Sequence, residues 1–301
     1  MRITALSGGV GGARMVRGLA SLPEVELTVI VNVGDDDEIY GLPLSPDLDT
    51  VIYTLAGEHS EERGWGRTEE TWLVMDELGR FPIDTSFRIG DRDLALNLYR
   101  NARLRHGAGL SRVTAEIARS FGVGATVLPV TEDTLRTKVL VDDEWLDFQD
   151  YFVRRRHADP VSAIRFDGAE LAAPAPGVIT NLESAEAVVI GPSNPMLSIW
   201  PILAVPGVRE AMRGKRVLAV SPLVGGRAVK GPLGELLPAL GFSADAAGIV
   251  ATYGEALTDL VVHVGDTPSM PIGPRVFETD TMIADADAAT RLAREVLSWL
   301  Q

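Results

Sequence analysis

The chain opens with a short apolar segment that runs straight into a glycine-rich turn, Ser7-Gly8-Gly9-Val10-Gly11-Gly12, and a helix is expected to begin near Ala13. Because glycine has no Cβ, such a turn lets the backbone approach a ligand closely. The helix that follows offers unpaired N–H groups and its positive dipole end to an anion. The turn therefore predicts a phosphate-binding site where a strand meets a helix. Its expected contacts are Gly8, Gly9, Gly11, Gly12 and Arg14.

The same turn departs from the two most familiar nucleotide-binding patterns. In GxGxxG the third glycine would fall on Arg14, and the GxxxxGK[ST] pattern is absent. The acidic run Gly34-Asp35-Asp36-Asp37, where a single ribose-binding acid would be expected, also disfavours a nicotinamide-dependent dehydrogenase. Glycine-rich turns also occur without a ligand, so the turn alone leaves the function open.

The composition is that of an ordinary globular protein, with 46% hydrophobic and 23% charged residues among 301. No run approaches the roughly 18 apolar residues of a membrane-spanning helix, and the N-terminus does not resemble a signal peptide. We therefore expect a cytoplasmic protein with no membrane partner. The absence of cysteine excludes disulfides, zinc–thiolate sites and thiol nucleophiles.

The formal net charge of -14 disfavours nucleic acid as a partner, because the phosphate backbone would be repelled. An anionic substrate must instead be held by a local basic or backbone-amide site. The four histidines show no metal-ligand spacing, so a bound metal is expected to be a hard, oxygen-liganded ion such as Mg²⁺.

The order of apolar segments predicts an α/β fold. Strands are expected at Ile3–Leu6, Leu27–Val33, Ala187–Ile190 and Arg216–Val220, with a helix at Ala13–Ser21. This alternation is typical of a Rossmann-like, open, mostly parallel sheet flanked by helices. Ligands gather at the carboxyl ends of such strands, so we expect the four loops that follow these strands to converge on one crevice.

The stretch from about residue 60 to 125 has mostly helical periodicity, and we interpret it as a helical insertion or cap within a single domain of residues 1–301. Its expected helices are Thr68–Leu78, Arg92–Arg105 and Ser111–Phe121. Short strands are expected later at Thr126–Leu128, Thr137–Val141 and Val161–Phe166, and a last helix at about Ala284–Leu300.

The motif Ser45-Pro46-Asp47-Leu48-Asp49-Thr50 precedes an apolar helical run. Asp47 or Asp49 could simply cap that helix. Alternatively, the two carboxylates bind Mg²⁺ beside a diphosphate, where the metal neutralises charge and orients the reacting oxygens. Asn32 and Asp35 end a core strand just upstream and add polar groups near the same edge. Their neighbours Asp36 and Asp37 are more typical of a solvated turn.

Two further motifs fit a planar ligand less specifically. Trp65 lies between two glycines in Glu61-Glu62-Arg63-Gly64-Trp65-Gly66-Arg67, where it either packs on a neighbouring helix or stacks on a heterocycle. Gly90-Asp91-Arg92-Asp93 begins a helix, and Asp91 is suited to cap it, while Arg92 is suited to the surface. Both motifs leave a structural and a ligand-binding interpretation open.

The turn Gly191-Pro192-Ser193-Asn194-Pro195 follows a buried strand. Its prolines and glycine favour a rigid turn, and Ser193 and Asn194 offer hydrogen-bonding groups to a phosphate or a base. The alternative is an ordinary connection in which Asn194-Pro195 starts a helix. Downstream, Ser221-Pro222 and Lys230-Gly231 repeat the pattern and add a cation.

Taken in order, these motifs resemble the CofD/FbiA family, the phospholactate or phosphoenolpyruvate transferases of coenzyme F420 biosynthesis. The resemblance spans nearly the whole chain. The matching motifs are SGGVGGAR, NVGDD, SPDLDT, ERGWG, GDRDLA, FQDYFVR, IGPSNP and SP…VKGP.

The resemblance implies a Mg²⁺-dependent enzyme. Its acceptor would be the deazaflavin Fo and its donor a guanosine diphosphate-linked three-carbon acid. The terminal ribityl hydroxyl of Fo would attack the phosphorus next to the acid, and GMP would leave. Such transfer needs mainly positioning and charge stabilisation, so no catalytic triad is required. The resemblance leaves open which acid is transferred, and a homodimer is expected by analogy with such enzymes.

The resemblance also assigns roles to residues. The metal ligand and catalytic group is Asp47, with Asp49 second. Gly8 to Gly12 with Arg14 would hold the diphosphate, and Gly191 to Pro195 the guanosine part. The deazaflavin side would be lined by Arg63, Trp65, Asp91 and Arg92. The general base is open among a metal-bound alkoxide, Asp47 and Asp35.

A second function remains open from the sequence, that of a YvcK-like regulatory protein that binds a nucleotide-sugar and carries out no transfer. Such proteins resemble the chain in their glycine-rich opening and their sheet. They are not expected to retain the ERGWG and GDRDLA pair.

Overall fold

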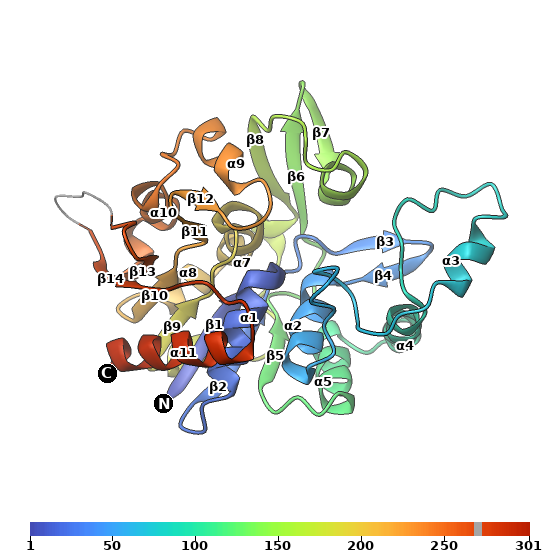
Figure 1. The fold of residues 1–301 in the computed structure, drawn as a ribbon. Helices are drawn as coiled ribbons and strands as arrows, with labels where there is room; N and C mark the ends of the chain where they lie inside the picture. The colour runs from blue at the N-terminus through green and yellow to red at the C-terminus, as the bar shows by residue number, and fades with distance from the viewer. Residues whose placement is uncertain (268–272) are drawn as a thin grey trace.

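The computed structural model describes residues 1–267 and 273–301. Its centre is a seven-stranded sheet in the order β14-β13-β10-β9-β1-β2-β5, in which every neighbouring pair is parallel (Figure 1). The strands are β1 (Arg2–Ser7), β2 (Glu26–Val31), β5 (Thr126–Pro129), β9 (Ala187–Ile190), β10 (Arg216–Val220), β13 (Asp259–His263) and β14 (Arg275–Thr279). The predicted α/β fold with an open parallel sheet is confirmed.

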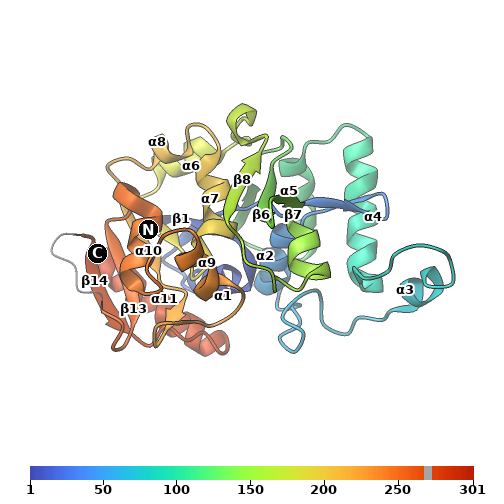
Figure 2. The same ribbon diagram turned by 90° about the horizontal axis from the view of Figure 1, so that it is seen from above.

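Helices cover both faces of this sheet (Figure 2). One face carries α1 (Gly9–Ala20), α2 (Pro46–Ala56) and α11 (Ala286–Leu300), and the opposite face carries α6 (Val178–Ser184), α7 (Trp200–Ala204) and α8 (Val208–Ala211). The remaining helices are α3 (Leu73–Leu78), α4 (Asp91–Arg105), α5 (Leu110–Ser120), α9 (Leu233–Ala239) and α10 (Ala246–Tyr253), with π-helical turns η1 (Asp150–Arg154) and η3 (Pro195–Ile199) and 3₁₀ turns η2 (Ala169–Leu171) and η4 (Gly254–Ala256). None of the described helices is long and apolar enough to cross a membrane.

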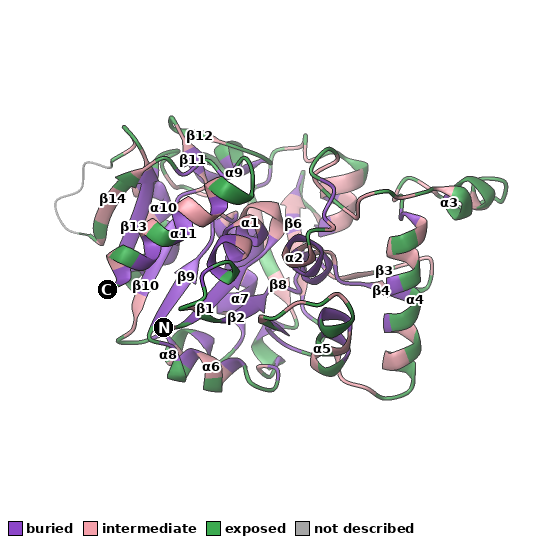
Figure 3. Cartoon of the chain, turned by 60° about the horizontal axis from the view of Figure 1, so that its bottom comes forward, coloured by how far each residue is buried: buried purple, intermediate pink, exposed green. Residues whose placement is uncertain are grey.

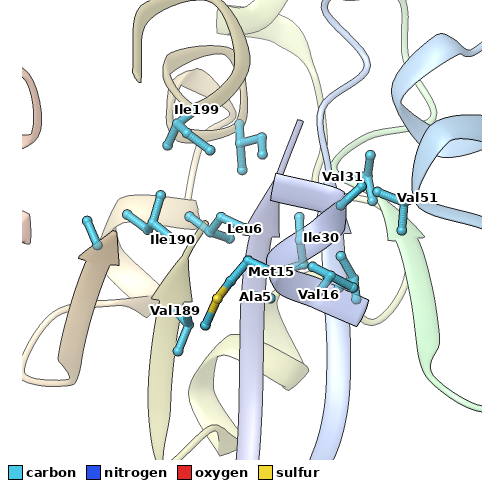
Figure 4. Packing of buried hydrophobic residues seen from close by; sticks show 14 of the residues in the cluster. Ala5, Leu6, Met15, Val16, Ile30, Val31, Val51, Val189, Ile190 and Ile199 are labelled. Atoms are coloured by element: carbon cyan, nitrogen blue, oxygen red, sulfur yellow. The ribbon is translucent and has the colours of Figure 1, made fainter. Parts of the chain in front are cut away.

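The central strands are apolar along their length because both faces are covered. All four residues of β9 are buried, as are five of the six in β1 and in β2. Leu6 of β1 lies beside Ile190 of β9, and Val31 of β2 lies near Val51 of α2 (Figure 4). Burial is concentrated in these strands and in the helix faces turned toward them, whereas α3 lies at the exposed periphery (Figure 3).

A smaller antiparallel sheet lies over the carboxyl ends of the main strands. It has the order β7-β6-β8, and its middle strand is tied to the loop after β2, because the N–H of Thr137 donates to the carbonyl oxygen of Gly34 at 2.8 Å. Its strands are β6 (Arg136–Val141), β7 (Glu144–Asp147) and β8 (Ala163–Asp167). The other short strands form two hairpins, β3 (Asp37–Ile39) with β4 (Leu42–Leu44) and β11 (Leu223–Val224) with β12 (Arg227–Ala228).

Two predicted helices need correction. Helix α1 begins at Gly9 rather than near Ala13, so Gly11 and Gly12 are helical residues in spite of glycine's low helix propensity. The helix expected at Thr68–Leu78 is confined to α3, because Thr68 and Glu69 form a turn in which Glu69 has left-handed backbone, with φ of +53°.

Two strands of the main sheet, β13 and β14, were not predicted from the sequence. Residues 60–125 contain α3, α4 and α5 and contribute no strand to the main sheet. The division into one domain with a helical insertion over this stretch stays a prediction.

Gly18 places α1 directly against the backbone of α11, because a Cβ on Gly18 would lie 2.2 Å from the carbonyl oxygen of Ala289. We expect Gly18→Ala to force the helices apart and to lower the free energy of unfolding by about 1–3 kcal/mol, measured by urea denaturation. Gly234 in α9 is the matched control, since a Cβ there meets nothing within 4 Å. Gly234→Ala is expected to raise the stability by up to about 1 kcal/mol. Equal effects of the two substitutions would contradict the close packing.

Candidate active site

The connections between strands reverse direction at the pair β1–β9. From β1 the chain moves to β2 and β5 on one side of the sheet, and it later returns to β9, β10, β13 and β14 on the other. In open α/β sheets such a switch point leaves a crevice at the carboxyl ends of the strands, where ligands bind. Because β2, β1, β9 and β10 are adjacent and parallel, their four following loops leave the same edge, as predicted.

The turns after β1 and β9 are in direct contact. A Cβ on Gly11 would lie 2.3 Å from the carbonyl oxygen of Pro192, and a Cβ on Gly191 would lie 2.8 Å from the Cα of Gly12. These distances are far inside van der Waals contact, so only glycine fits at these positions. The glycines that were expected to admit a ligand therefore also let the two turns approach each other.

Asp47 lies in the first turn of α2 and is 5% exposed. Its Oδ1 accepts a 2.7 Å hydrogen bond from the N–H of Gly9, and its Oδ2 accepts a 2.9 Å bond from Nδ2 of Asn32. The alternative in which Asp47 or Asp49 caps its own helix is wrong, because the N-cap is Ser45 and α2 has no side-chain cap bond. Asp47 instead joins the start of α1, the end of β2 and the start of α2.

Asp49 is paired with Arg100 of α4, which is 1% exposed. Arg100 donates from Nη1 to Oδ2 of Asp49 at 3.1 Å and from Nη2 to Oδ1. Arg100 also donates to Oδ1 of Asn97, which extends the contact along α4. Arg100 thus neutralises the charge of Asp49, and Asp47 has no such partner among the described residues. The role of Asp49 as a catalytic residue or metal ligand stays a prediction.

Asp35 and Asp47 form a buried acidic pair next to the turn after β1. Asp35 is 8% exposed, and its Oδ1 has no hydrogen-bond partner among the described residues. Burial and then the charge of Asp47 raise the pKa of Asp35 well above its usual range, against the hydrogen bond with Asn32. Burial likewise raises the pKa of Asp47, against the bonds from Asn32 and Gly9. Burial is thus the main cause of both shifts, and the charge of Asp47 adds to the shift of Asp35.

The solvated turn expected at Asp36 and Asp37 is not what the structure shows for Asp36. Its Oδ2 accepts a 2.7 Å bond from Oγ of Ser45, and its Oδ1 is buried without a partner among the described residues. Burial raises the pKa of Asp36 to about 8, against the Ser45 hydrogen bond. Asp37 begins strand β3. The acidic run is therefore buried or partly buried, and the β3–β4 hairpin starts at its last residue.

The donor set of this region fits a hard divalent cation. Within the described residues, no group of three or more Asp, Glu or His side chains is arranged to hold a metal ion. Mg²⁺, however, is usually bound by one or two carboxylates together with water and substrate phosphates. Asp47 is a buried carboxylate that forms no ion pair with a described residue, and Asp35 next to it has an unpartnered oxygen.

Trp65 is 44% exposed and packs against the edge of Trp72, with ring centroids 5.8 Å apart. The guanidinium of Arg63 lies over both rings, at 5.8 Å and 5.7 Å from the centroids, and donates to the carbonyl oxygen of Arg67. Trp65 therefore belongs to a cluster of two indoles and an arginine rather than to a helix interface.

Asp91 and Arg92 are engaged in the junction between α3 and α4. Asp91 does not cap α4, whose N-cap is Gly90; its carboxylate accepts bonds from the N–H groups of Leu73 and Val74 at the start of α3. Arg92 forms a surface ion pair with Glu69 at 3.3 Å. Since α3 lies at the outer end of the molecule (Figures 1 and 2), the structure does not bring these two residues to the switch point.

The polar side chains of the turn after β9 have structural partners. Ser193 Oγ donates a 2.8 Å bond to the carbonyl oxygen of Gly8. Oδ1 of Asn194 accepts bonds from the N–H groups of Met196 and Leu197, which makes Asn194 the N-cap of η3. The interpretation that Asn194-Pro195 initiates a helical segment is thus correct.

Arg14 forms an ion pair with Glu61, an acidic residue of the segment that follows α2. Its Nη2 donates to Glu61, and its Nη1 donates a 3.1 Å bond to the carbonyl oxygen of Ile283. Glu61 also pairs with Arg17 at 3.2 Å. The positive charge expected at the glycine turn is therefore present, but a carboxylate of the same chain already neutralises part of it.

A cleft of about 390 Å³ lies near the acidic run and is lined by Asp37, the last residue of that run. It runs between the β3–β4 hairpin and η1, and Tyr40 and Phe87 supply its aromatic walls. Gln149 also lines it and donates a 2.8 Å bond to the backbone carbonyl of Asp35. Its volume is within the range of small-molecule sites.

Sequence reasoning missed Arg100, Glu61 and His59. Arg100 had a detectable signal, because it follows Leu96 by four positions and so falls on the apolar face of its helix. Glu61 and His59 had none, since Glu61 bonds to α1 residues more than 40 positions away and His59 is affected by charges of the same helix.

Comparisons with known proteins match the chain over its whole length. The model of the family described as "2-phospho-L-lactate transferase CofD" matches residues 3–298. A 2-phospho-L-lactate transferase of Methanopyrus kandleri is 42% identical over 99% of this chain and 97% of its own length. A phosphoenolpyruvate transferase of Streptomyces griseus is 41% identical over 99% of this chain and 98% of its own.

Among solved structures, a member of the UPF0052 family from Bacillus halodurans is similar in fold. Its TM-score is 0.67 at 18% sequence identity, and the match covers 98% of each chain. At that identity the likeness concerns the fold alone.

The buried Asp49–Arg100 pair generates a stability prediction. Arg100→Met leaves Asp49 buried without a partner and is expected to lower the free energy of unfolding by about 3–5 kcal/mol in urea denaturation. Arg80→Met is the control, because the Arg80–Glu77 pair at 2.8 Å is exposed, and its loss is expected to cost less than about 1 kcal/mol. Adding Asp49→Asn to Arg100→Met should recover part of the loss. Equal effects of the two methionine substitutions would contradict a buried pair.

Asp93 in α4 generates a prediction on pH dependence. It accepts a 2.7 Å bond from the hydroxyl of Tyr53, and burial followed by the charge of Asp49 raises its pKa to about 7. Because the folded state binds this proton more tightly than the unfolded chain, the resulting stabilisation is full below about pH 4 and is lost as the pH rises to about 7.

We therefore expect Asp93→Asn to gain stability relative to the wild type between about pH 5 and about pH 8 in thermal unfolding. Asp143→Asn, at an exposed carboxylate of the β6–β7 turn, is expected to follow the wild type throughout. A constant difference between Asp93→Asn and the wild type would show that Asp93 does not titrate in this range.

Proposed function

Because the chain belongs to the 2-phospho-L-lactate transferase CofD family, we propose that it transfers a phosphorylated three-carbon acid to the deazaflavin Fo. The donor is a guanosine diphosphate-linked acid of the 2-phospholactate or phosphoenolpyruvate type. The oxygen of the terminal ribityl hydroxyl forms a bond to the phosphorus next to the acid, the phosphoanhydride bond breaks, and GMP leaves. The product is F420-0 or its dehydro form.

One observation carries this proposal, the meeting of the turns after β1 and β9 around buried Asp47 at the switch point. A strand-to-helix turn at such a point is where diphosphates of nucleotides bind in α/β sheets. We place the diphosphate at the turn Gly8–Gly12 and the guanosine part along the backbone of Gly191–Pro195. Transfer between bound phosphates and a hydroxyl needs positioning and charge stabilisation more than a covalent intermediate.

We propose Mg²⁺ as the cofactor, with Asp47 as its protein ligand. The ion supplies neutralisation of the charge on the transferring phosphoryl oxygens. Asp49 is second as a candidate ligand, because Arg100 donates to both of its oxygens. Asp35 is the proposed general base, since its unpartnered Oδ1 and its raised pKa suit it to take the hydroxyl proton, directly or through a water.

For the acceptor we propose the cleft between the β3–β4 hairpin and η1. Its aromatic walls, Tyr40 and Phe87, suit a planar heterocycle, and Gln149 connects the cleft to the backbone of Asp35. The exposed Trp65–Arg63 cluster remains a second candidate surface for the ring. Asp91 and Arg92 are left out of the acceptor site, because they bond to Leu73 and Glu69 near the junction between α3 and α4. The homodimer and the cytoplasmic location stay predictions.

Mass spectrometry of reaction mixtures tests the proposed function. The purified protein is incubated with Fo, Mg²⁺ and each guanosine diphosphate-linked acid in turn, and GMP and the phosphodiester product are quantified. One donor is expected to give product and GMP in equal amounts. Absence of product with every donor of the three-carbon class, from folded protein, would reject the transfer.

Asp47→Asn in the same assay tests the metal ligand. The substitution keeps the side-chain shape and removes the charge, so we expect at least an approximately 100-fold loss of GMP release and a higher Mg²⁺ requirement. Asp143→Asn is the control, because it makes the same charge change at an exposed carboxylate of the β6–β7 turn that does not line the proposed acceptor cleft. Unchanged release by Asp47→Asn would remove Asp47 from the ligand set.

A further inference from the structure

A basic cluster lies along α1 one turn beyond the glycine-rich start. Arg14 and Arg17 are three residues apart and therefore share one helix face. Both donate to the carboxylate of Glu61, Arg14 to Oε2 and Arg17 to Oε1 at 3.2 Å. Lys230, from the loop between β12 and α9, donates a 3.2 Å bond to the carbonyl oxygen of Gly64, and Arg14 is the charge that acts on it most strongly. Two of these three cations thus pair with one carboxylate, and the third, Lys230, lies close enough for the charge of Arg14 to act on it.

His59 lies within this cluster and is 4% exposed. Neither of its ring nitrogens has a hydrogen-bond partner among the described residues. The charges that act on its ring are those of Glu61, Arg14, Lys230 and Arg17, and burial lowers its pKa. A buried imidazole placed among four charged groups and bonded to none of them is unusual, because buried polar groups are normally paired.

The arginines also present donors that Glu61 does not use. Nε of Arg14 and both Nε and Nη2 of Arg17 are buried and lack an acceptor among the described residues. Leaving such donors unpaired costs about 1–3 kcal/mol each, and more for charged groups. A single carboxylate has two oxygens and one negative charge, so it satisfies neither the charge nor the donors of this cluster. In a chain with a net charge of -14, this local excess of cations is the feature to explain.

We propose that Arg14, Arg17, Lys230 and His59 form a binding site for a phosphate-class oxyanion, in which the Glu61 carboxylate is an exchangeable internal occupant. A tetrahedral oxyanion carries more acceptor oxygens and more charge than a carboxylate, and arginine forks match it well. When the anion enters, Glu61 leaves the arginines for solvent, which its 44% exposed side chain already contacts.

Two sources of such an anion share this chemistry, free orthophosphate and the phosphates of a nucleotide. The nucleotide source rests on the proposed function, because the donor of that reaction carries a diphosphate next to α1. The anion site itself does not depend on transfer activity.

Calorimetric titration of orthophosphate into the wild type and two variants tests the site. Glu61→Gln removes the internal anion, and we expect it to bind orthophosphate about tenfold more tightly than the wild type, as the loss of a competing charged hydrogen bond implies. Glu62→Gln is the matched control. It makes the same charge change one residue away, and the Glu62 carboxylate has no ion pair or hydrogen bond with any described residue.

The double variant Glu61→Gln with Arg17→Gln is expected to lose the gain, because it removes unused donors of the site. Thermal unfolding of each variant confirms that it is folded, and orthophosphate should raise the melting temperature of Glu61→Gln more than that of Glu62→Gln. Equal orthophosphate affinities of the two single variants, both folded, would overturn the proposal.

Titration with GDP separates the two sources. If Glu61→Gln raises the affinity for GDP as it does for orthophosphate, the nucleotide's phosphates are the occupant. If the gain is confined to orthophosphate, the site takes a free anion. Failure of the anion site leaves the mass-spectrometric test of transfer untouched, so the two proposals fail separately.

Discussion

The carboxylate of Asp47 holds together the three segments on which the crevice depends. It accepts from the first N–H of α1 and from Asn32 at the end of β2, while its own backbone begins α2. Burying a carboxylate is costly, and here two hydrogen bonds and the positive ends of two helices offset the cost. The fit is tight, because a Cβ on Gly8 would lie 2.8 Å from Oδ2 of Asp47 and 2.6 Å from Cβ of Ser198. The shape of the glycine turn is therefore set by a residue 38 positions away.

Much of the fold could be predicted because its signals are local. Four central strands are recognisable in the sequence as apolar runs followed by turn residues. Two of them, β9 and β10, have the predicted bounds. The helical start of α1 could not be predicted, because glycine disfavours helix and only contact with the turn after β9 makes Gly11 and Gly12 favourable there. The edge strand β14 is only partly buried, so it lacks the apolar run that marks the central strands.

The motifs of the candidate site could be predicted from the sequence, but the partners of their side chains could not. The glycine turn, Asp47 and the turn after β9 do meet at one edge, as strand order requires. The roles expected for Asp49 and Asp91 depended on which partner each side chain finds. Arg100 pairs with Asp49, and the N–H groups at the start of α3 donate to Asp91. These contacts join residues 17 to 51 positions apart. Spacing within a motif carries no information about such partners.

Helix α1 separates two environments of opposite charge. At its start lie the buried carboxylates of Asp35 and Asp47, and at Arg14, about 8 Å further along the helix axis, begins the basic cluster. A ligand that bears phosphates and a cation has complementary charges for both regions, whereas an anion alone suits only the second. This arrangement is compatible with the proposed binding of a polyanionic donor by a strongly acidic protein. The carboxylates of Asp35 and Asp47 are complementary to a cation, and the basic cluster is complementary to phosphates. The glycine-rich start of α1 lies between these two regions.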